Sequence, residues 1–196
     1  MIETATPVYG WERVMRAADK VIERLHRAVA ALEGAGVPYA VVGGHAVAEW
    51  VGRIDEGAVR TTKDVDLLLR RPDFPAAKAA LESAGFLYTH LLGIDVFVDG
   101  PDGKPSGGIH LLYANERVKD RDAYTPPDVA ESEPGNGFTV LSLPALVCMK
   151  LTANRLKDRV HMLDLIGVGQ LDATWPARLP PPIGERLQQL LDDPDG

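Results

Sequence analysis

The sequence predicts a single α+β (α/β) domain in which a small mixed β-sheet is flanked by helices. Short apolar segments rich in β-branched residues alternate with segments that have helical spacing of apolar residues. With 196 residues and 45% hydrophobic content, the chain is long enough for one core and short for two domains. We therefore predict one domain over residues 1–196, with its core at about 37–167.

The first element is a helix over residues 11–33. Its apolar side chains recur every three or four positions, with charged residues between them. Gly34, Gly36 and Pro38 follow, and these residue types end helices. The predicted buried face consists of Val14, Ala17, Val21, Leu25, Val29 and Leu32.

Next, a short strand at 39–42 leads directly into a glycine pair, Gly43-Gly44, and a helix at 45–51. A polar, glycine-containing connection fills residues 52–63. The apolar run that follows predicts a buried strand over 64–69.

Beyond this strand, prolines at positions 72 and 75 open a helix at about 74–84, which Gly85 closes. Residues 93–98 and 109–113 have the composition of two strands and resemble a hairpin with a long loop. Residues 114–137 are polar and rich in proline, so we expect an extended excursion before a short strand at 138–141.

A long helix is predicted to begin near Leu143-Pro144. Its expected buried face comprises Met149, Ala153, Leu156, Val160 and Leu163. Its expected polar face carries Lys150, Asn154, Lys157, Asp158, His161 and Asp164. Three prolines at 180–182 then precede a short helix in a C-terminal tail, residues 172–196.

Composition excludes several classes of protein. The net charge of −7 argues against broad, non-specific binding to nucleic acid. No apolar run reaches the ~18–20 residues that span a bilayer, and the N-terminus has no signal-peptide pattern, which predicts a cytoplasmic protein without membrane contact. Cys148 is the single cysteine, so an intrachain disulfide is excluded.

Two carboxylates one residue apart, Asp64 and Asp66, are the most informative feature of the sequence. Side chains alternate along a strand, so both point to the same face, roughly 7 Å apart along the chain. Two like charges at the mouth of an apolar strand are unfavourable unless a positive charge lies between them. Carboxylate oxygens suit Mg²⁺, so the pair predicts a site for a divalent cation.

The order of these motifs resembles that of the nucleotidyltransferase superfamily with the polymerase-β-type palm. A strand leads into Gly43-Gly44 and a helix, and Thr62-Lys63-Asp64-Val65-Asp66 lies at the next strand. Glycines at a helix N-terminus allow the backbone to approach a phosphate. Met149-Lys150-Leu151, Arg155-Leu156-Lys157-Asp158 and Asp164-Leu165 are similar to a signature of small prokaryotic members, which include AbiEii-type toxins of toxin–antitoxin systems.

The resemblance implies an enzyme that transfers a nucleotide from a nucleoside triphosphate to an acceptor hydroxyl and releases pyrophosphate. It implies Mg²⁺ (or Mn²⁺) held by Asp64 and Asp66. The implied catalytic residues are Asp64, Asp66 and Lys150, and the implied nucleotide-binding residues are Gly43, Gly44, Thr62, Lys150 and Asp158. The acceptor stays open among a small molecule, a protein and an RNA end, and the oligomeric state is open as well.

The third metal ligand has two candidates. The superfamily carries a third carboxylate on a neighbouring strand, and Asp95 has that local sequence, whereas the following strand offers His110 instead. Imidazole is a poor ligand for Mg²⁺ and suits transition metals better. A carboxylate beside Asp64 and Asp66 favours the enzyme, while a histidine without metal favours a degenerate module used for binding or regulation. A hydrolase that uses the same acids is a third reading.

Overall fold

The structure, a computed structural model, describes residues 10–120 and 122–194, and the predicted mixed α/β fold class is confirmed. Its strands form one mixed sheet in the order β3-β4-β5-β2-β1-β7-β6. The strands are β1 (Ala40–Val42), β2 (Val65–Leu69), β3 (Phe86–Leu91), β4 (Ile94–Asp99), β5 (Ile109–Tyr113), β6 (Ser132–Pro134) and β7 (Thr139–Leu141). The α-helices are α1 (Gly10–Gly34), α2 (Gly43–Gly52), α3 (Phe74–Ser83), α4 (Leu143–Ala153), α5 (Leu156–Gly167) and α6 (Ile183–Asp192).

The central strands place three chain segments in one row. Strand β2 pairs antiparallel with β1 and parallel with β5, so Asp66 is in register with Val42 on one side and with His110 on the other. The backbone enters α2 directly after Val42. The glycine turn, the acidic strand and His110 therefore meet at one edge of the sheet.

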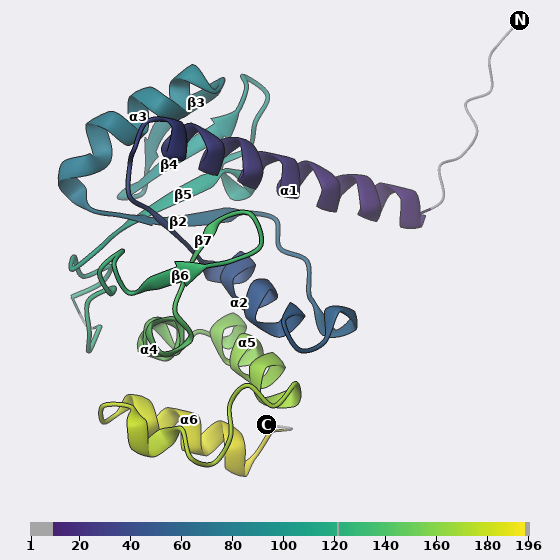
Figure 1. Cartoon of the computed structure of the whole chain (residues 1–196), viewed down its shortest axis with the longest axis vertical. Coiled ribbons are helices and arrows are strands. Elements are labelled where there is room, and N and C mark those ends of the chain that lie inside the picture. Colours follow the sequence, from purple (N-terminus) through teal and green to yellow (C-terminus); the bar gives the residue numbers. More distant parts are fainter. Residues whose placement is uncertain (1–9, 121, 195–196) are drawn as a thin grey trace, which may run out of the picture.

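The sheet separates two hydrophobic cores, as alternation along the strands requires. Ala40 and Val42 point into the core that includes residues of α2, α4, α5 and α6. Val41 points into the core that includes residues of α1 and α3. Figure 1 shows the two groups of helices on opposite sides of the sheet.

Helix α1 matches the predicted helix closely, but its predicted buried face is wrong at the N-terminal end. Only Leu25, Ala28, Val29 and Leu32 are buried, whereas Val14 is 52% exposed. The reason is position, because the N-terminal half of α1 extends beyond the sheet (Figure 1).

The single long helix predicted from Leu143 is two helices. Asn154 adopts the left-handed conformation that ends α4, a conformation that asparagine tolerates better than most residues. Of the predicted buried face, Met149 and Leu163 pack against the core, but the prediction is wrong at Leu156, which is 78% exposed. Lys150 and Asp158, predicted for the polar face, are buried.

Strand β3 was not predicted, and it pairs antiparallel with β4 at the edge of the sheet. The predicted neighbours β4 and β5 are antiparallel, as a hairpin requires. In the C-terminal tail, α6 buries Ile183, Leu187 and Leu190 in the core of α4 and α5. Residues 195–196 of that tail lie outside the described part. None of the helices in the described segments combines the length and apolarity needed to span a bilayer.

Candidate functional site

Asp64, Asp66 and His110 form a cluster at the edge of the sheet. Each contributes one atom, and these ligand atoms all lie within 4.8 Å of one another. The Nδ1 atom of His110 is 3.4 Å from Asp66 Oδ1 and 3.7 Å from Asp64 Oδ2. The two carboxylates thus share one face of the β2 region, as strand alternation requires. Two carboxylate oxygens and an imidazole nitrogen at these separations are a donor set that fits a divalent cation.

Asp95, the other candidate for the third ligand, lies on the opposite face of the sheet. It is in register with Leu111 of β5, one residue beyond His110, and a shift of one residue turns a side chain to the other face. Its carboxylate accepts hydrogen bonds from Tyr88 and Tyr113 and contacts His90 Nδ1 at 2.7 Å. Asp95 therefore anchors β3 and β5 to β4 and is not part of the cluster.

The charges within the cluster compensate one another. Burial opposes the ionisation of Asp66, but its hydrogen bond with His110, aided by Lys150 and Lys157, outweighs burial and lowers its pKa. The same hydrogen bond raises the pKa of His110 against the effect of burial. The cluster thus stabilises both a carboxylate at Asp66 and positive charge beside it.

Both glycines of the turn leave room for the acidic segment. Gly43 has φ +68°, and a β-carbon on it would overlap the carboxylate of Asp66, lying 2.7 Å from Cγ. A β-carbon on Gly44 would lie 2.8 Å from Thr62 Oγ1. Val42, which precedes α2, makes no side-chain capping hydrogen bond. The N–H groups of this helix N-terminus are therefore free of a side-chain cap, as an anion site requires.

Thr62 positions one of the acids. Its hydroxyl donates a hydrogen bond of 2.9 Å to Asp64 Oδ1. The other oxygen of that carboxylate, Oδ2, is the one nearest His110. Thr62 thus orients Asp64 toward the centre of the cluster.

Lys150 is buried beside the cluster rather than on an exposed helix face. Its ammonium donates to His161 Nδ1 at 3.0 Å and to Asp158 Oδ1 at 3.3 Å. Burial lowers the pKa of Lys150, and the charges of Asp158 and Asp66 partly offset this effect. Burial and the nearby Lys150 charge lower the pKa of His161 to about 4. Neutral His161 accepts a hydrogen bond from the Lys150 ammonium at Nδ1, which holds the ammonium in place.

Asp158 is fully buried and forms an internal ion pair. It accepts hydrogen bonds from Arg155 Nε at 2.6 Å and from the Arg155 backbone N–H at 3.2 Å. Burial opposes its ionisation, but Arg155 and Lys150 lower the pKa overall. Its contacts within the protein join the start of α5 to the end of α4.

Two cavities meet at Asp66 and Lys150, which line both. The first, of about 290 Å³, has Gly44, Asp64 and several cationic side chains in its wall. Its cations are Arg60, Lys63, Lys150 and Lys157. The second, of about 110 Å³, has a more apolar wall that includes Leu112, Val118, Tyr124 and Met149. The first cavity thus gathers cations beside Asp64, while the second exposes more apolar surface, although Lys119 and Arg155 also line it.

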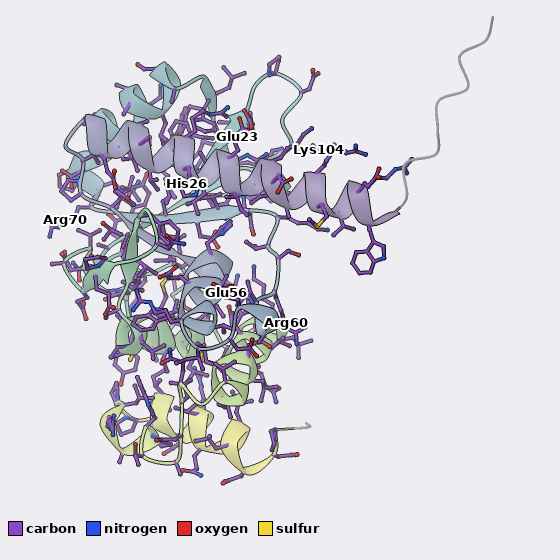
Figure 2. The ribbon with its side chains drawn as sticks, turned by 45° about the vertical axis from the view of Figure 1, so that its right-hand side comes forward. Glu23, His26, Glu56, Arg60, Arg70 and Lys104 are labelled. Atoms are coloured by element: carbon purple, nitrogen blue, oxygen red, sulfur yellow. The ribbon has the colours of Figure 1, made fainter. Side chains whose placement is uncertain are left out.

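Sequence reasoning missed part of the cationic wall. Lys63 could have been predicted as a site residue because it lies between Thr62 and Asp64 in the sequence. No sequence pattern indicates Arg60, because it lies in the irregular connection before β2. Figure 2 shows Arg60 close to α5, and its Nε bonds both carboxylate oxygens of Asp164, at 2.8 and 2.9 Å.

No protein-family model matches the sequence, and neither does any curated protein. Solved structures do match. The solution structure of the antibiotic-resistance factor ANT(2'')-Ia has a TM-score of 0.55 at 16% identity, covering 89% of this chain and 91% of that chain. The crystal structure of ANT(2'')-Ia with adenylyl-2''-tobramycin has a TM-score of 0.54 at 16% identity, over 91% and 99%.

Two further structures extend the likeness. A putative nucleotidyltransferase from Helicobacter pylori has a TM-score of 0.52 at 14% identity, over 91% of this chain and 78% of that one. An antigenic nucleotidyltransferase-like protein from Paracoccidioides brasiliensis has a TM-score of 0.50 at 19% identity, over 90% and 88%. These likenesses show that the chain has the nucleotidyltransferase fold.

Proposed function

We propose that this protein is a metal-dependent nucleotidyltransferase, which transfers a nucleotide from a nucleoside triphosphate to an acceptor hydroxyl. The observation that carries the proposal is the meeting of three features at one cavity. Asp64 and Asp66 of the acidic cluster, Gly44 at the uncapped N-terminus of α2, and several cationic side chains all line it. A triphosphate needs all three, because it carries several negative charges and is bound together with a cation.

The cationic side of the site is assigned to the triphosphate. Lys63, Lys150 and Lys157 supply charge, and the N–H groups at the start of α2 supply hydrogen-bond donors. The glycines keep these donors close to the acids. A bound metal ion would act as a Lewis acid: it would neutralise charge on the phosphates and help to activate the acceptor hydroxyl.

The apolar side is assigned to the uncharged parts of the substrates. Leu112, Tyr124 and Met149 would pack against a base or the body of an acceptor. The crystal structure of ANT(2'')-Ia with adenylyl-2''-tobramycin provides a precedent for a small-molecule acceptor on this fold. We keep a small molecule, a protein and an RNA end as the acceptor classes to test.

A transfer assay tests the proposal. Labelled nucleoside triphosphates are incubated with the protein, Mg²⁺ or Mn²⁺, and acceptors of the three classes. We expect labelled product with the wild type and almost none with Asp64→Asn or Asp66→Asn, which keep the side-chain shape and remove a metal-binding charge. Asp102→Asn is the matched control, because Asp102 is an exposed acid outside both cavities.

A second candidate function is a binding or regulatory module with a degenerate site, such as a partner in an AbiEii-type toxin–antitoxin system. The observation that favours it is the histidine at position 110, where the superfamily carries a carboxylate. Nucleotide binding without transfer, unaffected by Asp64→Asn, is the result that this second function predicts. Transfer that depends on Asp64 and Asp66 rejects it.

A further inference from the structure

His110 holds the place that completes the acidic cluster, and its ring is fixed in one orientation. It lies next to Asp66 in the parallel register of β2 and β5. Its Nε2 atom is 2.7 Å from the carbonyl oxygen of Pro105. A carbonyl can only accept, so Nε2 carries the proton and donates it.

This hydrogen bond leaves Nδ1 as the atom that faces the acids. Nδ1 lies 3.4 Å from Asp66 and 3.7 Å from Asp64. With the Nε2 proton held by Pro105, an ion that binds here displaces only the Nδ1 proton and takes the Nδ1 lone pair. Histidines that bind metals characteristically donate their other ring N–H to a backbone carbonyl or a carboxylate. Pro105 thus has the position of the outer partner of a metal ligand.

Thr62 fixes a second member of the set in the same way. It holds Oδ1 of Asp64, while Oδ2 faces His110. The ligands are therefore oriented by neighbouring groups before any ion arrives. Two atoms that each lie about 2.1 Å from an octahedral ion are about 3 Å apart when adjacent, so small movements bring these three atoms to one ion.

We propose that the cluster binds a first-row transition-metal ion, with Mn²⁺ as the reference ion, in preference to Mg²⁺, through Asp64, Asp66 and Nδ1 of His110. Mg²⁺ prefers an octahedron of oxygens and loses water reluctantly, whereas imidazole nitrogen is a good ligand for transition metals. The inference rests on the proposed function only in treating the cluster as a metal site. The inference goes beyond the proposed function by naming the preferred ion, Mn²⁺, and the atom that makes it preferred, Nδ1 of His110.

Metal binding by itself provides the test. Mn²⁺ is titrated into wild-type protein by electron paramagnetic resonance, with Mg²⁺ as competitor, and pulsed measurements detect ¹⁴N nuclei coupled to the bound ion. We expect ¹⁴N coupling in the wild type and its loss in His110→Asp. We also expect the Mn²⁺-over-Mg²⁺ affinity ratio to fall roughly tenfold in that variant. His90→Ala is the matched control, because His90 contacts Asp95 on the other face, and we expect it to keep the coupling.

Three results overturn the inference: no Mn²⁺ binding by the wild type, bound Mn²⁺ without ¹⁴N coupling, or an unchanged affinity ratio in a folded His110→Asp variant. The wild-type spectrum decides the ligand even where the variant does not fold. Metal binding with ¹⁴N coupling but no nucleotide transfer upholds the inference and contradicts the proposed function. Mg²⁺-supported transfer without ¹⁴N coupling does the reverse.

Discussion

Gly43 and Asp66 are so close that the carboxylate occupies the space where a β-carbon of residue 43 would lie. Val42 is the register partner of Asp66, and the chain turns into α2 at the next residue. The glycine therefore has a role toward the acid in addition to the phosphate contact that its motif predicts.

Gly43→Ala should abolish metal binding by displacing Asp66. It should also cost about 1–2 kcal/mol of unfolding free energy from the positive φ, with a further loss from the overlap. The control is Gly36→Ala, because Gly36 has φ +64° and nothing within 4 Å of a β-carbon. It should lose similar free energy from φ alone and keep metal affinity. Unchanged metal binding in Gly43→Ala would show that Asp66 is not positioned as described.

Thr62→Val removes the hydroxyl that holds Asp64 and preserves the side-chain shape. Loss of such an outer hydrogen bond weakens metal binding by roughly 10–100-fold. Isothermal titration with Mn²⁺ measures the effect. Thr61→Val, at the exposed neighbouring residue, is the control. We expect it to leave the Mn²⁺ affinity unchanged. Equal affinities for the two variants contradict the positioning role of Thr62.

Lys150→Met should lower nucleotide transfer roughly tenfold or more, because a buried cation beside Asp66 is lost. Unfolding free energy should fall by about 1–3 kcal/mol, since Asp158 loses one partner and retains Arg155. Steady-state kinetics and urea unfolding measure the two effects separately. Lys104→Met, in the loop before β5 (Figure 2), is the exposed control and should change neither. A variant that loses stability while keeping full transfer confines Lys150 to a structural role.

His161 should make stability depend on pH. The folded protein holds its pKa at about 4 against an ordinary value of 6.5, so the unfolded chain binds an additional proton between these values. Stability from this group is therefore present above about pH 6.5 and lost as the pH falls toward 4. When the pH falls from about 7 to 4.5, the unfolding free energy of His161→Gln should therefore decrease by about 2 kcal/mol less than that of the wild type.

Urea unfolding at the two pH values measures this difference. His26→Gln is the control, because the exposed His26 lies outside both cavities, and it should follow the wild type. Parallel losses in His161→Gln and the wild type contradict the assigned state of His161.

Local pattern was sufficient to predict the acidic side of the site. Alternation along a strand fixes the relation of Asp64 to Asp66 without knowledge of any other segment. The third position was not determined in this way, because Asp95 and His110 both lie on plausible neighbouring strands. Only the register of β4 against β5 shows that Asp95 faces the other side.

The error in the C-terminal helices has a similar cause. Periodicity was applied through Asn154, whose left-handed conformation ends α4 and changes the face that α5 buries. Lys150 and Asp158 were assigned to a polar face because single charged residues are usually exposed. Here each neutralises part of the other's charge, which depends on contacts between helices. Strand β3 was missed because it is an edge strand with Leu87 and Leu91 exposed, although Phe86, Tyr88 and Thr89 favour a strand.

The central claim is that Gly43-Gly44 and the acidic cluster together bind a nucleoside triphosphate with its metal. The most direct test is a crystal structure of the protein with a non-hydrolysable nucleoside triphosphate and Mn²⁺. We predict phosphate oxygens at the N–H groups of α2 and an anomalous peak for Mn²⁺ between Asp64 and Asp66. A nucleotide bound away from the glycine turn, or phosphates at the turn without an ion at the acids, would contradict the claim.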